Sequence, residues 1–389
     1  METRCGAEAK GDCLVVVDND GGPKTDLAAR SKQLLERGLR AVIDETLSKL
    51  DASDISIAVT DSGALDYVLV ARIEAAVRGV LPEKPPISPP VQRKGTERDR
   101  PRRSRLYAPG NNPRLLAGIE IHGADCVLLD LEDSVPAEEK PAARILVKHL
   151  LAAVPFAEET WVRINPLDCG GLEDVAEVLR GRPHGICLPK ADSAADVAKL
   201  AEELARLEDE FGLGVGSTWI MPIIETARGV LHADEVAAAD PRVAIVAFGA
   251  EDYTRDLGAL RTSESLLFAR GRIVAAAAAA GVQSSDTVYA DLADMEGLAE
   301  EAQRARALGF DGKGAINPRQ IDPIHHAFTP SEQEMEQARA IVAAAREAEL
   351  QGLGAVALNG KMIDKPVLER ARRVMRHAEK LTKGGDRDA

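Results

Sequence analysis

Two apolar runs of this chain each end on acidic side chains. "IMPIIE" ends on Glu225, and "VAIVAFGAED" ends on Glu251 and Asp252. Residues that directly follow buried parallel strands lie at one edge of a sheet, where α/β proteins build their sites. Carboxylates are the ligands that Mg²⁺ and Mn²⁺ prefer. We therefore predict Glu225 and Asp252 as a pair of metal ligands. Strand alternation would turn their competitor, Glu251, to the opposite side.

Other strand-like runs also end on charged groups. These groups are Asp130, Glu132 and Asp133 in "LDLEDSV", Arg163 in "WVRINP", and Lys190 in "LPKAD". Arg163 can hold a substrate carboxylate through two parallel hydrogen bonds, which a lysine cannot do. The alternative role of Arg163 is a salt bridge to the "LDLED" acids. For Lys190 and Asp133 a structural pair near the rim is favoured over a direct role.

The predicted site is rich in carboxylates and contains no histidine or cysteine. A hard cation that chelates a carboxylate and a neighbouring oxygen stabilises an oxyanion or enolate. Because no Schiff-base lysine is evident, the residues favour metal-dependent cleavage or formation of a carbon–carbon bond beside a carbonyl. His325 and His326, in a predicted polar turn, are assigned no function.

The composition excludes several classes of partner. The chain has 389 residues, 45% of them hydrophobic, and a formal net charge of -14, which argues against nucleic acid or an anionic membrane as the main partner. Five cysteines without C-x-x-C spacing are typical of a reduced cytosolic protein. There is no signal-peptide core and no apolar run of membrane-spanning length, so we expect a soluble, cytoplasmic protein.

Four segments divide the chain. Residues 1–81 alternate β-α-β-α, which indicates a small α/β module. Residues 82–101 are rich in proline and then basic, as in a semi-rigid, solvated linker. Residues 102–325 alternate strand-like and helical patterns about eight times, which predicts a (β/α)8 TIM barrel. A doubly wound open sheet is less favoured, because no Gly-rich turn follows the first strand. Residues 326–389 predict a C-terminal helical extension, or lid, over the site.

Seven motifs together resemble the citrate lyase beta subunit and its relatives, the malyl-CoA and citramalyl-CoA lyases (HpcH/HpaI aldolase-like). They are "RRSRLYAPGNNPRLL", "GADCVLLDLEDSVPAEEKPAAR", "VRINPLD", "LPKADS", "IIETARGV", "DGKGAINPRQI" and "LNGKMIDKP". The resemblance implies a TIM barrel that uses Mg²⁺ to cleave a 3-hydroxyacyl thioester by retro-Claisen chemistry. It implies that Arg163 binds the substrate carboxylate and that Glu225 and Asp252 bind the metal, with Glu225 also at the substrate. It further implies that Asp364 is an acid/base on a C-terminal lid, often donated by a neighbouring subunit.

The N-terminal module resembles the citrate lyase gamma subunit, an acyl carrier protein, in "DSGALDYVLVARIEAAV" and "SKQLLERGLRAVIDETLSKL". A tether to such a carrier would raise its effective concentration at the barrel mouth. The carriers hold a CoA-derived arm on the serine of G-x-x-x-S-x-D. Here Gly6 and Asp12 match this motif, but Lys10 takes the place of the serine. Lysine cannot form the phosphodiester, so we expect a degenerate carrier kept for assembly or docking, and a barrel that acts on free CoA thioesters.

Three alternatives stay open at this stage. The substrate could be a citryl, malyl or citramalyl thioester. The chain could instead be a gamma-beta fusion subunit that works only in a complex with a citrate lyase alpha-type subunit. A non-catalytic scaffold is disfavoured, since the set of Arg163, Glu225, Asp252 and Asp364 is intact. A lid that acts across subunits predicts a homo-oligomer, and relatives suggest a trimer or a multiple of one.

Overall fold

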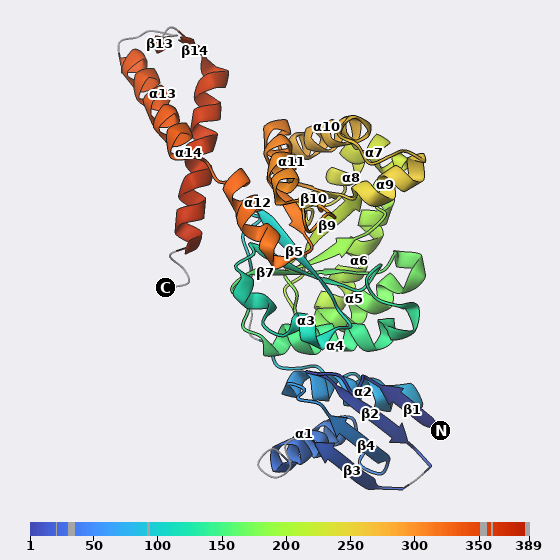
Figure 1. Ribbon diagram of the computed structural model, residues 1–389. Helices are drawn as coiled ribbons and strands as arrows, with labels where there is room; N and C mark the ends of the chain where they lie inside the picture. Colours follow the sequence, from blue (N-terminus) through green and yellow to red (C-terminus); the bar gives the residue numbers. More distant parts are fainter. Residues whose placement is uncertain (21, 30–35, 92–93, 351–355, 359–360, 386–389) are drawn as a thin grey trace.

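The computed structural model describes residues 1–20, 22–29, 36–91, 94–350, 356–358 and 361–385. Three parts follow one another along the chain in Figure 1: a small N-terminal domain, a barrel, and a helical arm that ends the chain. Within the described residues, no helix is both long and apolar enough to cross a membrane.

The N-terminal domain is a four-stranded sheet covered by two helices. In the order β1-β2-β4-β3, the strands are Glu2–Cys5, Cys13–Asp18, Ser56–Asp61 and Lys24–Ala29, and the helices are α1 (Glu36–Lys49) and α2 (Asp66–Val80). The sequence predicted β2, β4 and both helices but missed β1 and β3. These two strands form the edges of the sheet and are largely polar, so they lack the apolar signal of a buried strand.

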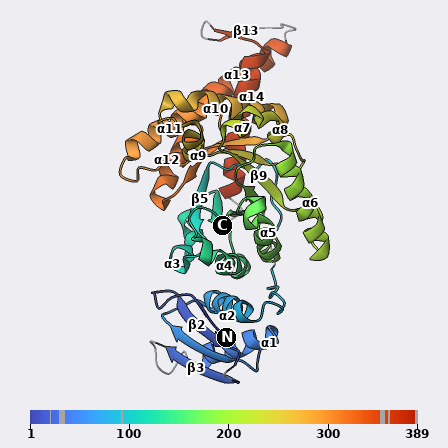
Figure 2. The same cartoon turned by 90° about the vertical axis from the view of Figure 1, so that its right-hand side faces the viewer.

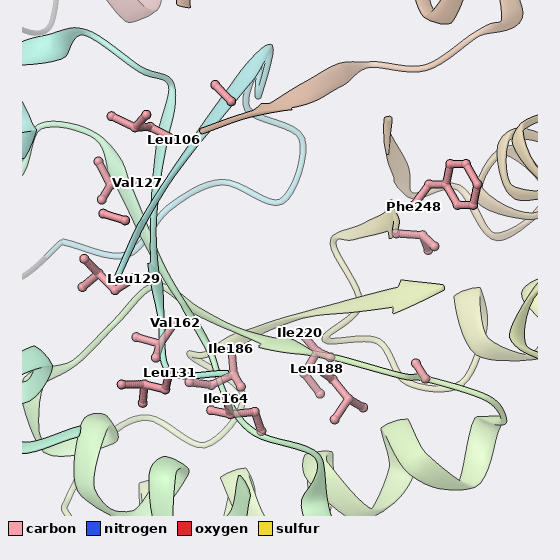
Figure 3. Packing of buried hydrophobic residues seen from close by; sticks show 14 of the residues in the cluster. Leu106, Val127, Leu129, Leu131, Val162, Ile164, Ile186, Leu188, Ile220 and Phe248 are labelled. Carbon is pink, nitrogen blue, oxygen red and sulfur yellow. The ribbon is translucent and has the colours of Figure 1, made fainter. Parts of the chain in front are cut away.

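Eight parallel strands close into a barrel, which confirms the predicted fold. The strands are β5 (Ser104–Pro109), β6 (Cys126–Asp130), β7 (Glu159–Arg163), β8 (Gly185–Leu188), β9 (Trp219–Ile224), β10 (Ile245–Phe248), β11 (Gln283–Asp286) and β12 (Gly312–Ala315). Figure 3 shows Leu106, Val127, Leu129 and Val162 on successive strands, all members of the main buried cluster. A second buried cluster contains Trp161, and a Cβ on Gly185 would lie 2.3 Å from its ring.

Helices surround the strands as in other (β/α)8 barrels. They are α3 (Pro113–Leu116), α4 (Lys140–Ala153), α5 (Leu172–Val178), α6 (Ala194–Glu210), α7 (Ala227–Leu231), α8 (Ala233–Ala237), α9 (Ala250–Leu257), α10 (Ser263–Ala280), α11 (Met295–Leu308) and α12 (Ile321–Phe328). The segment boundary proposed at 325/326 falls inside α12. His325 and His326 therefore lie on a helix and not in a turn.

The linker makes hydrogen bonds to the barrel, although many of its described residues are exposed to solvent. The Thr96 hydroxyl donates to Glu159 Oε1 at 2.5 Å, and Trp219 Nε1 donates to Thr96 Oγ1 at 3.2 Å. Arg98 donates to the carbonyl of Val243 at 3.1 Å. Glu159 and Trp219 begin β7 and β9, so this stretch of the linker lies at the end of the barrel opposite to the predicted site.

The chain ends in a helical arm. Its two helices are α13 (Glu332–Leu350) and α14 (Lys365–Gly385), and between them lies the hairpin of β13 (Val356–Leu358) and β14 (Lys361–Ile363). Figures 1 and 2 both show the hairpin at the end of the arm that stands away from the barrel. Within one chain, the arm is therefore not a closed lid.

Candidate active site

Glu225 is a buried carboxylate directly after β9. Its side chain is almost inaccessible to solvent, and Oε1 accepts a hydrogen bond from the backbone N–H of Lys190 at 2.8 Å. A Cβ on Gly249, directly after β10, would lie 2.4 Å from Glu225 Oε2, so glycine is needed there for the carboxylate to fit. Burial, together with the nearby charges of Glu132 and Asp252, raises the pKa of Glu225 to about 8.

Asp252 and Glu251 lie in the first turn of α9, because β10 already ends at Phe248. The side chain of Asp252 is 17% exposed and pairs with Arg255. Glu251 is 54% exposed and pairs with Arg261, whose Nε lies 2.7 Å from Glu251 Oε1. The two acids thus differ in direction as predicted, but helical rotation, and not strand alternation, is the cause.

Arg163, the last residue of β7, is held by the acids of the neighbouring strand end. Nε and Nη2 donate to the two carboxylate oxygens of Asp130 at 2.6 and 2.8 Å, and Nη1 lies 2.9 Å from Glu132 Oε2. Arg163 thus makes two parallel hydrogen bonds to Asp130 and not to a substrate. This contact is the salt bridge to the "LDLED" acids given above as its alternative role. Nη1, which does not contact Asp130, lies near Glu132 and Asp133 instead. Burial opposes the positive charge, but Asp130 outweighs it and raises the pKa of Arg163.

Lys190 pairs with Glu132, not with Asp133. Its backbone has a φ of 49°. Its N–H donates to Glu225, and its Nζ contacts Glu132 Oε1. Asp133 is 58% exposed, with Oδ2 3.4 Å from Arg163 Nη1. Glu132 is therefore the residue that joins the two cations, a role that the sequence did not assign. Its Oε2 is buried beside Arg163 Nη1, and burial raises the pKa of Glu132.

Asp364 connects β14 to α14 and lies outside this group of residues. It is exposed, and its Oδ1 accepts a hydrogen bond from Val367 N at 3.1 Å at the start of the helix. Because the hairpin stands away from the barrel in both views, one chain does not bring Asp364 to Glu225 (Figures 1 and 2). His325 belongs to the opposite end of the barrel, where Nε2 contacts the hydroxyl of Ser104, the first residue of β5, at 2.8 Å.

The donors at the strand ends suit a hard cation. Among the described residues, no three His, Cys, Asp or Glu side chains are placed to hold a metal ion together. Asp252 nevertheless lies close enough to Glu225 for its charge to contribute to the raised pKa of Glu225. Mg²⁺ is commonly bound by one or two carboxylates, with water and substrate oxygens completing its octahedron. The residues present therefore fit this ion.

The fold and the site define a (β/α)8 barrel protein with an acidic site at the carboxyl ends of its strands. The family model described as HpcH/HpaI aldolase/citrate lyase matches residues 103–318. A second model, described as malonate decarboxylase delta subunit (MdcD), matches residues 1–80. This chain belongs to the HpcH/HpaI aldolase/citrate lyase family, with a domain similar to an acyl carrier protein at its N-terminus.

Curated relatives and solved structures agree with this membership. The citrate lyase subunit beta of Escherichia coli K12 is 44% identical over 297 residues, which cover 75% of this chain and 97% of that protein. The mitochondrial citramalyl-CoA lyase of Homo sapiens is 34% identical, over 70% of this chain and 84% of that protein. The structure of CitE from Mycobacterium tuberculosis with magnesium, acetoacetate and coenzyme A is 34% identical, with a TM-score of 0.60, and covers 73% of this chain and all of that one.

Proposed function

We propose that this chain is a Mg²⁺-dependent carbon–carbon lyase that cleaves a 3-hydroxyacyl-CoA thioester of the citryl-CoA type into an oxoacid and an acyl thioester. The observation that carries this proposal is the buried carboxylate of Glu225 directly after β9, with Asp252 in the first turn after β10 and Arg163 at the end of β7. The related structures with magnesium, acetoacetate and coenzyme A, or with magnesium and oxaloacetate, support the metal, the oxoacid product and a coenzyme A group on the substrate.

The proposed reaction needs a group that stabilises negative charge on the substrate oxygens, a group that binds the substrate carboxylate, and a proton donor. Bound by Glu225 and Asp252, Mg²⁺ would supply a Lewis acid for the substrate oxygens. Nη1 of Arg163 would orient the substrate carboxylate. The C3 hydroxyl gives its proton to the carboxylate of Asp364, its oxygen forms the carbonyl of the oxoacid, and the C2–C3 bond breaks. The electron pair of that bond passes into the thioester enolate, which then takes a proton at C2. We assign that proton to Asp364.

Gly249→Ala should weaken Mg²⁺ binding without removing any ligand. The added Cβ would lie 2.4 Å from Glu225 Oε2 and would force the carboxylate to move. We expect the Mg²⁺ concentration for half-maximal activity to rise about 10- to 100-fold, as for other changes that displace a metal ligand. Gly271→Ala is the control, since a Cβ there meets nothing within 4 Å. An unchanged Mg²⁺ dependence in Gly249→Ala would contradict this role of Glu225.

We propose that Asp364 acts across subunits. Within one chain the hairpin beside it stands away from the barrel, and Met362 on that hairpin is 67% exposed. An arm of this kind can reach the site of a second copy, so we expect a homo-oligomer, a trimer or a multiple of one. A partner of the citrate lyase alpha type is the alternative, in which the chain works only within a complex.

Mixing two inactive variants tests this arrangement. Asp364→Asn alone should lower kcat by about 10²- to 10⁴-fold, as expected for the loss of a general acid. Co-expression of Asp364→Asn with Glu225→Gln should restore activity well above that of either variant, because some sites would pair an intact Glu225 with an intact Asp364. If Asp364 acted within its own chain, no mixed oligomer would have a complete site, and activity would stay at the level of the single variants.

The free thioester is the proposed form of the substrate because Lys10 replaces the arm-bearing serine. Lys10 is exposed in the turn before Asp12. Citryl-CoA, malyl-CoA and citramalyl-CoA, each offered with Mg²⁺, test the proposal by the release of their oxoacids. We expect cleavage of at least one, abolished by EDTA and restored by Mg²⁺ or Mn²⁺. No cleavage of any by the purified chain, with activity restored by an alpha-type subunit, would favour the complex.

A further inference from the structure

The N-terminal domain is packed against the outside of the barrel. Figure 1 shows α2 lying along α4, and Tyr67, Val68 and Ala71 of α2 belong to the same buried cluster as the barrel core. A carrier that delivers a covalent arm to a site has to move. A helix that shares its core with the barrel cannot do so without exposing apolar surface to water.

A buried ionic cluster adds to this contact. Glu74 of α2 is fully buried, and its oxygens lie 2.6 Å from Lys148 Nζ and 2.6 Å from His149 Nε2 of α4. Lys148 Nζ also contacts Glu177 of α5 at 2.6 Å, and Arg78 of α2 contacts Glu177 at 2.9 Å. Separating the domains would break the contacts of Glu74 with Lys148 and His149 and the contact of Arg78 with Glu177. Only the pairs within each body, Glu74–Arg78 and Lys148–Glu177, would remain, and losing buried ionic contacts is strongly unfavourable. The domain is therefore held in one position.

Arg72 connects the former carrier motif to the rim of the barrel. Its Nε and Nη2 donate to the carboxylate of Asp12 at 3.0 and 2.9 Å, and Nη2 also donates to the backbone carbonyl of Asn111 at 3.2 Å. Asp12 matches the aspartate of the carrier motif, and both side chains of the pair are less than a tenth exposed. Asn111 lies in the loop that follows β5, which is at the site end of the barrel.

The loop held by Arg72 continues to the substrate-binding group. The N–H of Gly110 donates to the carbonyl of Asp130 at 2.8 Å, and Asn111 Nδ2 donates to Glu139 Oε2 at 2.6 Å. The Asp130 carboxylate in turn holds Arg163 through two hydrogen bonds. A continuous series of contacts therefore connects Asp12 to Arg163. It passes through Arg72, the Gly110–Asn111 loop and Asp130.

We propose that the carrier-like domain works as a fixed brace of the active-site rim, and that Arg72 is the positioning residue through which it holds the first βα loop and, with it, Asp130 and Arg163. The assignment of a substrate carboxylate to Arg163 rests on the proposed function; the brace itself does not. This role explains why Asp12 is useful in a domain where lysine replaces the serine: it neutralises Arg72 at the interface.

Arg72→Met tests the brace, with Arg78→Met as the matched control. Both variants remove an interface arginine of α2 that pairs with an acid, but only Arg72 contacts the barrel loop. We expect Arg72→Met to raise KM for the thioester about 10-fold with little change in kcat, because Arg163 would bind the substrate carboxylate less tightly. Arg78→Met should leave KM near the wild-type value.

Hydrogen exchange of the amide of Gly110 gives a readout that does not need activity. We expect faster exchange in Arg72→Met than in wild type or Arg78→Met, because the loop loses its anchor. Asp12→Asn, which keeps Arg72 but removes its counter-charge, should show a smaller change in the same direction. Equal exchange in Arg72→Met and Arg78→Met, in folded proteins of similar melting temperature, would overturn the brace. If exchange changes as expected but no thioester is cleaved by wild type, the proposed function fails and the brace stands.

Discussion

Glu225→Gln should abolish Mg²⁺-dependent cleavage, lowering kcat/KM by about 10²- to 10³-fold or more, as for the loss of a group that stabilises charge in the transition state. The amide keeps the size of the side chain and can still accept from Lys190 N, but it removes the negative charge that a cation needs. Calorimetric titration with Mg²⁺ should show binding to wild type and none to the variant, which separates loss of the metal from loss of chemistry.

Glu251→Gln is the control for this change. Glu251 is an acid on the same helix as Asp252, but it pairs with Arg261 and is 54% exposed. We expect Mg²⁺ binding and kcat/KM within a few-fold of wild type, about 1 kcal/mol or less for an exposed pair. If Glu251→Gln lost Mg²⁺ and Glu225→Gln retained it, the choice of metal ligands made here would be wrong.

Lys148→Met should lower the free energy of unfolding by about 3 to 5 kcal/mol, the usual effect of removing one partner from a buried ionic group. Lys148 is fully buried between Glu74 and Glu177, so its loss leaves these two buried acids with the partly exposed Arg78 as their remaining shared cation. Urea unfolding measures the effect. Arg206→Met is the control, because Arg206 pairs with exposed acids and should cost about 1 kcal/mol or less. Equal effects of both variants would argue against a tightly docked domain.

The same cluster predicts a loss of stability in acid. Burial opposes ionisation of Glu74, but the hydrogen bond from His149 and the charge of Lys148 outweigh it and hold the pKa of Glu74 at about 2. In the unfolded chain the pKa of a glutamate is about 4.3. The folded state therefore binds the proton less well, and this contribution is present above pH of about 4.3 and is lost as pH falls toward 2. Melting temperatures from pH 6 to pH 3 should fall less steeply in Glu74→Gln than in wild type.

The barrel could be predicted from sequence because its strands are buried on both faces. Runs such as those of β6 and β9 are almost continuously apolar, which is the pattern of a parallel strand covered by helices. Strands β1 and β3 gave no such signal, since edge strands with polar residues look like loops.

Residue types indicated candidate members of the site but not the contacts that these residues make. The apolar runs indicated Glu225, but they could not show that β10 ends before Glu251 and that Asp252 belongs to a helix. Nor could they show that Asp130 takes both parallel hydrogen bonds of Arg163, because this pairing depends on the register of β6 against β7. The position of Asp364 depends on the arm formed by α13 and α14, whose placement is set by tertiary contacts that short motifs do not reveal.

One pattern in the sequence indicates that the N-terminal domain docks on another part of the chain. Helix α2 buries residues on every side, including the charged Arg72 and Glu74. A helix that covers only its own sheet has one apolar stripe, whereas a helix that is buried all round has a second body against it. This pattern in "DYVLVARIEAAVRGV" would have favoured a docked domain over a tethered, mobile one.

Cleavage of citryl-CoA by the purified full-length chain tests the central claim most directly. The protein should come from its native host, its intact mass should first be measured, and the reaction should contain Mg²⁺ and no other protein. We expect the mass of an unmodified chain, together with catalytic release of oxaloacetate and acetyl-CoA that stops in EDTA. A mass increased by a prosthetic group on the N-terminal domain, with no turnover of citryl-CoA or of its malyl and citramalyl analogues, would contradict it.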